Sequence, residues 1–376
     1  MQQQNDSIVI LDQASGYLQI DMLEAYSKKY KHLVIIAGSI VERGSPLPEN
    51  VVWHKIIKYD QSTTFKRLYT WLFGSLNMFC IVLRHYRKAH IVAITNPPFS
   101  IFVPWLLKCS YDILIYDMYP DALVQYGYLK EKNLIFKFWS ALNKKAFSKA
   151  KHVFTLTEGI KQLAQNYTEK KKVHIVPLWS SASDFEQIPR AENLILEKVN
   201  SKDKFNIVYS GNLGLTHPVE KLIDLAEMLD PKYFSVIIIG GGAKKRLLEK
   251  KMSEKKLQNV HLLPWQPIEL LSHNLCSGDI NVVTLDKQAS NLSIPSKTFN
   301  ILSIGNPILG ICDENSGLAE LINTYDCGII SDGENLNELA KQMIDLEGHK
   351  QKIATMKANS LKASQNFTKA NAKAFV

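Results

Sequence analysis

Short apolar runs rich in Val and Ile recur along the chain and alternate with segments whose apolar residues follow a helical spacing. In the first half, such runs predict seven strands, at 8–11, 33–37, 51–57, 91–95, 113–116, 153–156 and 173–176. Helical patterns lie between several of these runs, at 17–30, 64–88, 131–148 and 158–167. This alternation predicts an α/β domain with a doubly wound, mostly parallel sheet.

The second half repeats the pattern more regularly. Strands are predicted at 206–210, 235–239, 260–263, 280–285, 308–311 and 328–331. Each is followed by a helical pattern, at 218–229, 244–256, 267–275, 296–304, 316–324 and 334–346. We therefore predict two Rossmann-like doubly wound domains, 1–180 and 205–347, that face a central cleft. A linker at 181–204 joins them, and a helical tail follows at 348–376.

Composition supports a globular protein and argues against several classes of site. Of the 376 residues, 46% are apolar and 22% are charged, which excludes a disordered chain. The five cysteines are odd in number and form no C-x-x-C pair, which argues against a disulfide scaffold or a zinc ribbon and favours a reducing compartment. No His, Cys or carboxylate spacing suggests a metal site. We expect neither a metal nor a bound cofactor.

The positive charge lies entirely in the first half. Residues 1–190 hold 24 Lys and Arg against 15 Asp and Glu, whereas residues 191–376 hold 21 of each. Such an excess favours an anionic partner, either a lipid surface, a lipid phosphate or a nucleic acid. Nucleic acid is disfavoured because no aromatic and basic residues interleave and no known motif is present. An ordinary solvated surface is the alternative.

One apolar stretch, 68–83, has basic residues at both ends. It contains Trp71, Leu72 and Phe73 and is flanked by Lys66, Arg67, Arg84, Arg87 and Lys88. The stretch is too short to span a bilayer. It predicts either a helix in a membrane interface or a buried helix with basic ends. Because no signal peptide is visible, we expect a cytoplasmic protein, with peripheral contact to the inner face of the cytoplasmic membrane left open.

Three motifs in the second domain suggest an anion site. YSGNLG at 209–214 and IGGG at 239–242 are glycine turns that directly follow strands, where backbone amides can approach an anion. In the third motif, Pro295 is predicted at the first position of a helix, which exposes the amides of Ser296 and Lys297. These donors and the ammonium suit a diphosphate, and Asn300, one turn later, suits a sugar hydroxyl. Tight turns without a ligand remain the alternative.

Polar residues also follow strands in the first domain. Asp117 and Asp121 come after the strand at 113–116, where a ligand site of this fold is expected. We predict a catalytic role for both, although Asp121 also suits an N-cap. Asn96, and Ser15 with Gly16, follow two other strands and are predicted with Asp121 to contact an acceptor substrate.

Across residues 205–345 the chain resembles the donor domain of glycosyltransferase family 4, retaining enzymes of the GT-B fold. The motifs that carry the resemblance, in the family's order, are YSGNLG at 209–214, IIGGG at 238–242, NVHLLPW at 259–265, GDINVV at 278–283, PSKTFN at 295–300, GNPIL at 305–309 and GLAELI at 317–322. The chain is most similar to the bacterial branch that builds capsule and O-antigen repeats. The first domain resembles an acceptor domain more loosely, through YDMYPDALV at 116–124.

The resemblance implies a nucleotide-diphosphate sugar, with UDP favoured and GDP as the alternative base. The donor contacts predicted from the turns and the resemblance together are Gly211, Asn212, His217, Gly241, Trp265, Gln266, Ser296, Lys297 and Asn300. At the position of Asp117, family members have a cleft residue near the transferred sugar. The resemblance also implies that Lys297 stabilises the leaving diphosphate. The acceptor would be a hydroxyl of a glycan or of a polyprenyl-diphosphate-linked glycan.

Two departures from the family pattern affect the donor. A pair of Glu is usual at the positions of Leu292 and Asn300, and an Arg and a Lys are usual at Asn212 and close to His217. Because the first Glu usually contacts hydroxyls of the donor sugar, Leu292 predicts a less hydroxylated donor, such as a deoxy or acetamido sugar. Two alternatives stay open: a sugar-nucleotide 2-epimerase of the same architecture, and a non-catalytic subunit that retained the fold.

Overall fold

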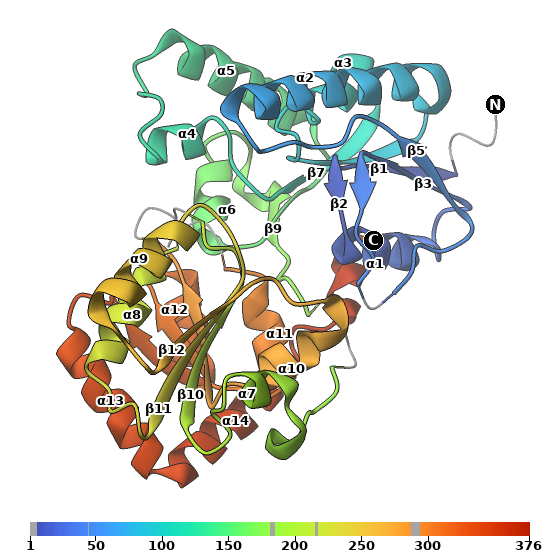
Figure 1. The fold of residues 1–376 in the computed structure, drawn as a ribbon. Helices are drawn as coiled ribbons and strands as arrows, with labels where there is room; N and C mark the ends of the chain where they lie inside the picture. The colour runs from blue at the N-terminus through green and yellow to red at the C-terminus, as the bar shows by residue number, and fades with distance from the viewer. Residues whose placement is uncertain (1–5, 44, 181–184, 215–216, 287–293) are drawn as a thin grey trace. The chain divides into compact units, whose positions relative to one another are not determined.

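The computed structural model describes residues 6–43, 45–180, 185–214, 217–286 and 294–376 (Figure 1). The chain forms two compact units. The N-terminal unit comprises Met1–Ala182 together with Lys369–Val376, and the C-terminal unit comprises Ser183–Thr368. Each unit is built on its own parallel sheet covered by helices, which confirms the predicted α/β class.

The N-terminal unit has a seven-stranded sheet in the order β5-β3-β1-β6-β7-β8-β9, and every neighbouring pair is parallel. Its strands are β1 (Ser7–Leu11), β3 (His32–Ala37), β5 (Val51–Lys55), β6 (His90–Ile94), β7 (Ser110–Ile115), β8 (Val153–Thr155) and β9 (Val173–Ile175). A short separate pair joins β2 (Ala14–Ser15) to β4 (Ser39–Ile40). Every side chain of β1 is buried, as expected for a central strand covered on both faces. All seven strands predicted in this half are confirmed.

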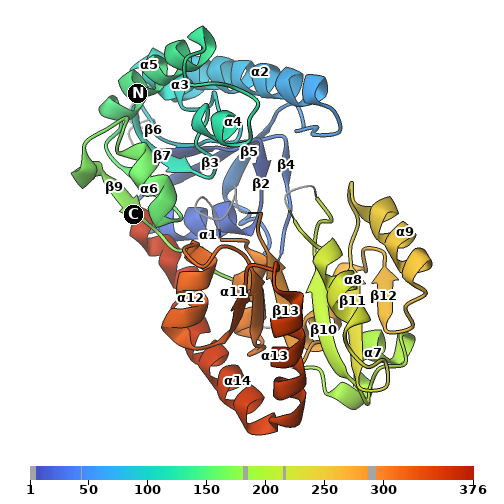
Figure 2. The ribbon, with the colours of Figure 1, turned by 90° about the vertical axis from the view of Figure 1, so that its left-hand side faces the viewer.

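Helices cover both faces of this sheet. They are α1 (Tyr17–Tyr26), α2 (Thr64–Ile81, continued by a π-helical turn at Val82–Tyr86), α3 (Phe102–Leu107), α4 (Asp121–Gln125), α5 (Leu134–Lys149) and α6 (Glu158–Ala164). Helix α1 packs on one face together with the 3₁₀ segment Lys369–Phe375. Helices α2, α3 and α5 lie together on the other face (Figures 1 and 2). Among the described residues, no helix is both long and apolar enough to cross a membrane.

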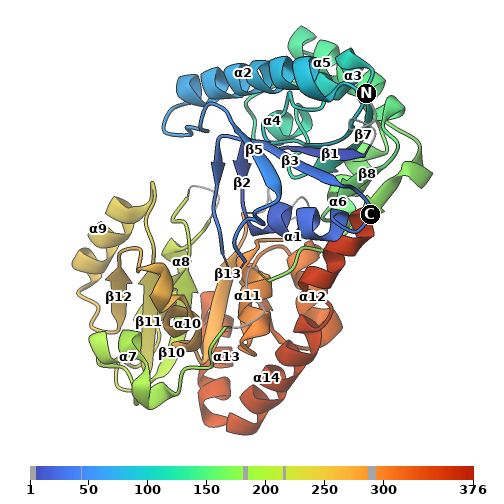
Figure 3. The same ribbon diagram turned by 90° about the vertical axis from the view of Figure 1, so that its right-hand side faces the viewer.

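The C-terminal unit has a six-stranded parallel sheet in the order β12-β11-β10-β13-β14-β15. Its strands are β10 (Phe205–Ser210), β11 (Phe234–Ile239), β12 (Val260–Leu263), β13 (Ile280–Thr284), β14 (Ile308–Ile311) and β15 (Gly328–Ser331). Its helices are α7 (Leu194–Lys198), α8 (Glu220–Glu227), α9 (Lys245–Lys255), α10 (Leu271–Cys276), α11 (Lys297–Ser303), α12 (Gly317–Tyr325), α13 (Leu336–Gly348) and α14 (Lys350–Ser364). In Figure 3, the labelled strands of this sheet follow one another from left to right as β12, β11, β10 and β13, and α14 lies at their lower right.

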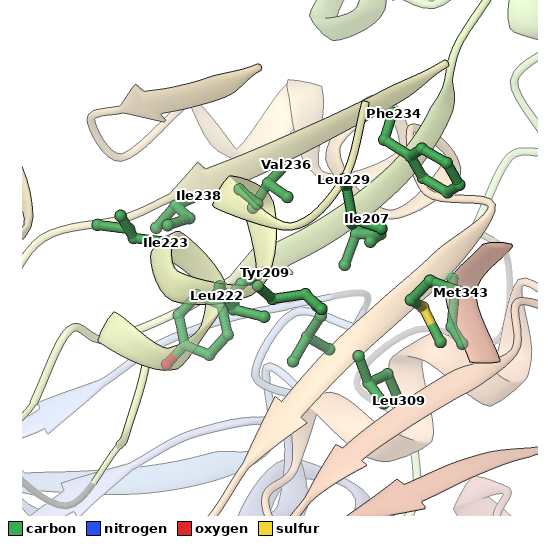
Figure 4. Close-up of a cluster of buried hydrophobic side chains, with 14 of the residues drawn as sticks. Ile207, Tyr209, Leu222, Ile223, Leu229, Phe234, Val236, Ile238, Leu309 and Met343 are labelled. Atoms are coloured by element: carbon green, nitrogen blue, oxygen red, sulfur yellow. The ribbon is translucent and has the colours of Figure 1, made fainter. Parts of the chain in front are cut away.

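Alternate residues of the central strands fill the core of this unit. Ile207 and Tyr209 of β10 point to one face, where they join Leu222 of α8 in a fully buried cluster (Figure 4). Val208, between them, points to the opposite face and packs with Leu196 of α7. The period-two alternation therefore buries both faces of β10, which fixes the position of the turn that follows its carboxyl end.

The division between the units differs from the prediction at two places. Residues 181–204 were expected to be a linker, but 194–198 form α7, whose Ile195 and Leu196 are buried against β10 and β11. The predicted tail also divides. Helix α14 packs on α11 of the C-terminal unit, whereas 369–376 belong to the N-terminal unit. In both places, buried apolar side chains hold the segment against its unit. In the sequence these side chains are spaced too sparsely to show a helical or strand period.

Candidate functional site

Two glycine turns lie side by side at the carboxyl ends of β10 and β11. Ser210 and Ile239 are the last paired residues of these strands, and the Gly211 amide donates to the Ile239 carbonyl at 2.9 Å. Gly240 has a φ of +149°, and a Cβ at this position would collide with the carbonyl oxygen of Gly211. The turns therefore pack backbone on backbone, which explains why the sequence places glycines at both.

The side chain of Lys297 reaches from α11 to the first of these turns. Its Nζ lies 3.8 Å from the ring centroid of Tyr209, and it is buried with no hydrogen-bond partner among the described residues. A Cβ on Gly211 would meet this ammonium, so the glycine provides the space that it occupies. Burial lowers the pKa of Lys297 from 10.5 to about 7. A desolvated ammonium without a counterion is a site that an anion would complete.

The start of α11 differs slightly from the prediction. Pro295 was expected at the first helical position, but α11 begins at Lys297 with Ser296 as its N-cap. The amides of Thr298 and Phe299 donate to the carbonyls of Pro295 and Ser296, at 2.9 and 3.2 Å, because the first turn is tight. Ser296 is exposed and its side chain makes no capping hydrogen bond. The predicted donor residues Ser296 and Lys297 thus adjoin the glycine turns, but from a tighter turn than expected.

His217 and Asn212 lie on the same side of the unit. The Nδ1 of His217 is 3.0 Å from the carbonyl oxygen of Thr284, at the end of β13. Burial lowers the pKa of His217, and the ammonium groups of Lys297 and Lys244 lower it further. His217 is therefore neutral at pH 7 and adds no charge to the site. Asn212 is exposed as a residue, but its side-chain amide lies against both glycine turns, since a Cβ on Gly214 or Gly242 would meet its Nδ2 or Oδ1 at 2.9 or 2.7 Å.

The remaining predicted donor contacts surround these turns. Trp265 follows β12, is 59% exposed, and directs its indole Nε1 toward Gly241, at 3.0 Å from where a Cβ would lie. The side-chain amide of Gln266 donates to the Pro264 carbonyl at 2.7 Å, so this residue is occupied in its own loop. Asn300 lies one turn beyond Lys297 and is partly buried. An exposed indole beside a glycine turn suits the face of a nucleobase.

In the N-terminal unit, the two predicted carboxylates have different surroundings. Asp117 lies two residues after β7, and its amide donates to the Thr95 hydroxyl at 3.3 Å. Much of the residue is exposed, yet burial of its carboxyl raises the pKa of Asp117. Asp121 is the first residue of α4 rather than its N-cap, and its Oδ2 accepts a hydrogen bond from the Tyr167 hydroxyl at 2.7 Å. Asp121 thereby holds α4 to the segment that follows α6. Of the two, Asp117 is the more exposed residue.

The predicted acceptor residues Ser15, Gly16 and Asn96 are joined by internal hydrogen bonds. The buried hydroxyl of Ser15 donates to the Asp12 carbonyl at 3.1 Å, and the Asn96 side chain donates to Asp12 Oδ1 at 3.0 Å. The Gly16 amide donates to the Gln19 side chain at 2.9 Å. These residues therefore build the loop after β1, and Ser15 offers no exposed hydroxyl.

Asp12, which the sequence reasoning missed, lies at the centre of that network. Its carboxyl is completely buried, and Oδ2 has no partner among the described residues. Burial raises its pKa from 3.8 to about 7. The available signal was its position directly after the strand at 8–11, which is the signal that singled out Asp117.

A recess of about 750 Å³ adjoins the start of α2 and was also not predicted. Its walls come from the loop after β5 and the first turns of α2, and they include Lys58, Tyr59, Lys66 and Tyr69. Leu292, by contrast, lies outside the described residues. Within the described ranges no group of three or more His, Cys, Asp or Glu residues is arranged to hold a metal ion.

Comparison with known proteins gives matches along most of the chain. Residues 191–363 match the model of the family described as glycosyl transferases group 1. The probable glycosyltransferase WbjE of Pseudomonas aeruginosa is 18% identical over 324 residues, which is 84% of this chain and 81% of WbjE. The putative colanic acid biosynthesis glycosyl transferase WcaI of Escherichia coli K12 is 28% identical over 157 residues, 41% of this chain and 39% of WcaI.

A solved structure shows the same fold over nearly the whole chain. The crystal structure of HepE from Anabaena in complex with UDP-glucose superposes with a TM-score of 0.71, at 13% identity, and the match covers 98% of this chain and 97% of HepE. HepE has also been solved with UDP and with UDP and glucose. Taken together, the matched family model and the curated relatives support a glycosyltransferase, and the chain has the GT-B fold.

Proposed function

We propose that this protein is a retaining, metal-independent glycosyltransferase. It moves a sugar from a nucleoside diphosphate, with UDP preferred, to a hydroxyl of a glycan or lipid-linked acceptor. The observation that carries the proposal is the buried, unpartnered ammonium of Lys297 beside the glycine turn at Gly211. The UDP complexes of HepE support the choice of nucleotide, and the name of WcaI, which refers to colanic acid, supports a surface polysaccharide as the product.

The chemistry rests on stabilisation of the leaving group. The bond between the anomeric carbon and the phosphate oxygen breaks, and negative charge develops on the departing diphosphate. The Lys297 ammonium and the amides of the glycine turns stabilise that charge. The acceptor oxygen bonds to the anomeric carbon on the same face, and its proton passes to the leaving phosphate oxygen. No protein carboxylate has to take that proton, which fits the presence of Asn300 where the family usually has Glu.

Asp117 is the proposed catalytic residue of the N-terminal unit, because it follows the carboxyl end of β7 and is more exposed than Asp121. Asp121 and Asn96 are proposed to hold the acceptor-side loops in place, since both have partners within the unit. We further propose a deoxy or acetamido sugar as the donor, on the basis of Leu292 in the sequence. All five cysteines are free, which supports a cytoplasmic location.

A nucleotide panel tests the donor site first. We expect UDP, at a hundredfold excess over its Kd, to stabilise the protein by about 2.7 kcal/mol, whereas CDP, ADP and NAD leave the melting temperature unchanged. Stabilisation by GDP instead of UDP would change the proposed nucleobase but would still support the donor site. The absence of a shift with any nucleotide would favour a non-catalytic subunit and refute the proposal.

Product analysis then separates transfer from isomerisation. UDP-sugars with 6-deoxy, acetamido and fully hydroxylated sugars are incubated with the protein, with and without a polyprenyl-diphosphate-linked acceptor. Acceptor-dependent release of UDP with an α-linked product from an α-linked donor supports a retaining transferase. Interconversion of UDP-sugars without an acceptor would instead establish an epimerase. Better turnover of glucose or mannose donors than of all others would refute the proposal about the sugar alone.

A further inference from the structure

Helix α2 exposes a long stripe of large apolar side chains. The stripe repeats at the spacing of one helix face and is 41–78% exposed. Its members are Phe65, Leu68, Tyr69, Leu72, Phe73, Leu76 and, in the following π-helical turn, Leu83. The other face of α2 is equally apolar but buried, with Trp71, Met78 and Val82 packed into the unit. Apolar side chains on both faces are typical of a helix that is covered on both sides.

The stripe continues onto neighbouring helices. Leu106 of α3 is exposed, as are Leu134, Ile135 and Phe138 of α5, at 62–80%. Helix α3 contacts both α2 and α5, and Figures 1, 2 and 3 all show the three helices together on one side of the sheet. We name the exposed apolar side chains of α2, α3 and α5 the apolar face.

A row of aromatic rings fixes these helices relative to one another. The ring of Trp71 in α2 lies 5.3 Å from that of Tyr119, which stacks at 6.1 Å on Trp139 of α5. Trp139 in turn lies 5.0 Å from Phe99, just before α3. These ring contacts pack α2, α5 and the start of α3 together, so the apolar face is one surface carried by helices in mutual contact.

The charge around the apolar face is mainly positive. Residues 61–111 contain six Lys and Arg and no Asp or Glu, and residues 128–151 contain seven Lys with Glu131 as the single acid. Lys66 is paired with Asp60, just before α2, at 3.6 Å, and the Arg67 guanidinium lies 5.3 Å from the ring centroid of Trp71. The local excess of cations, rather than any single side chain, attracts an external anion.

We propose that the apolar face binds an anionic lipid bilayer, with the α2 stripe seated among the acyl chains and the flanking arginines and lysines on the lipid phosphates. A bilayer meets both requirements at once, since it offers apolar depth and a negative surface. A second copy would bring two cationic faces together, and a nucleic acid would leave the apolar side chains unburied. The inference deepens the proposed function, because a lipid-linked acceptor would be encountered there, but vesicle binding does not depend on transferase activity.

Vesicle flotation tests the proposal with the full chain. The vesicles are made of phosphatidylglycerol with phosphatidylethanolamine, and phosphatidylcholine vesicles serve as the uncharged comparison. The variant Phe65→Ser/Leu72→Ser/Leu76→Ser removes three exposed side chains, so its melting temperature should match the wild type. The control Leu247→Ser/Ile344→Ser removes side chains of similar exposure from the C-terminal unit. A third variant, Arg84→Gln/Arg87→Gln, removes charge at one end of the stripe.

We expect the wild type and the control to bind phosphatidylglycerol vesicles at least tenfold better than phosphatidylcholine vesicles at low salt. The serine variant should lose at least tenfold in binding, and the glutamine variant should lose binding mainly at low salt. Wild-type protein that fails to float at low salt, or a serine variant that floats like the wild type, would overturn the proposal. A wild-type dimer that the serine substitutions dissociate, without vesicle binding, would assign the face to a second copy instead. In each of these cases the melting temperature is also measured with UDP. A rise with UDP would support the donor site, so the proposed function is tested separately from vesicle binding.

Discussion

Replacing Lys297 by Met should make the free protein more stable and its nucleotide binding weaker. The ammonium is desolvated and has no counterion, so the charged form is disfavoured in the folded chain. A pKa of about 7 instead of 10.5 corresponds to a cost of about 5 kcal/mol below pH 7, at roughly 1.4 kcal/mol per unit. Met has a similar length and carries no charge, so the variant escapes this cost.

The sign of the pH dependence follows from the same shift. Between pH 7 and 10.5 the unfolded chain holds a proton on Lys297 that the folded chain has released, so wild-type stability rises with pH across this window. The stabilisation by Lys297→Met should therefore be largest at pH 6.5 and small at pH 10. At about 2–4 °C per kcal/mol for a unit of this size, we expect the melting temperature at pH 6.5 to rise by roughly 10–20 °C.

Calorimetric titration with UDP measures the opposite effect. Loss of a charge-assisted hydrogen bond to the diphosphate, about 1.5–3 kcal/mol, weakens binding roughly ten- to hundredfold. The control is Lys251→Met, because the Lys251 ammonium is 2.7 Å from Asp224 and its removal should slightly destabilise the protein without affecting UDP. A Lys297→Met variant that melts lower than the wild type, or that binds UDP equally well, would refute the reasoning.

Four further substitutions test the roles of other residues in the two units. Gly211→Ala places a Cβ against the Lys297 ammonium, so UDP affinity should fall at least tenfold in a titration; unchanged affinity would contradict the packing. Asp12→Asn should abolish the loss of stability that the wild type shows as pH rises from about 4 to 7, and should stabilise the protein at pH 8 by roughly 2–4 kcal/mol in urea unfolding; a wild type with flat stability over that range would contradict it. Asp117→Asn should lower kcat at least a hundredfold without lowering the melting temperature, because it removes a charge that would stabilise the transition state, whereas Asp121→Asn should mainly lower the melting temperature; the reverse pattern would exchange their roles.

The sheets were predictable because their strands are short, continuous runs of Val and Ile bounded by polar turns, as in β1 and β10. The short helices α3, α4 and α7 have too few turns to show a period, and tertiary packing decides them. Lys297 could be selected from its motif, but its burial could not, because Tyr209 and Gly211 come from a distant part of the chain.

The exposed character of α2 illustrates the other limit of sequence reasoning. The apolar stretch at 68–83 fitted a buried helix and an interfacial helix equally well, because both patterns contain the same residues. Only the packing of Trp71 on one side and the exposure of Leu72 on the other distinguish the two. Asp12 and Asp117 present the same ambiguity, since each follows a strand and only the fold determines which is buried.

The return of the chain to its first unit has a consequence for its synthesis. The Tyr26 hydroxyl donates to the Phe375 carbonyl at 2.8 Å, and Ala372 and Phe375 are buried in the cluster that covers the α1 face of the sheet. On the ribosome, that face stays open while the whole C-terminal unit is being translated, and it can close only once residues 369–376 have left the exit tunnel. A chain that stops before these residues therefore has an unfinished first unit.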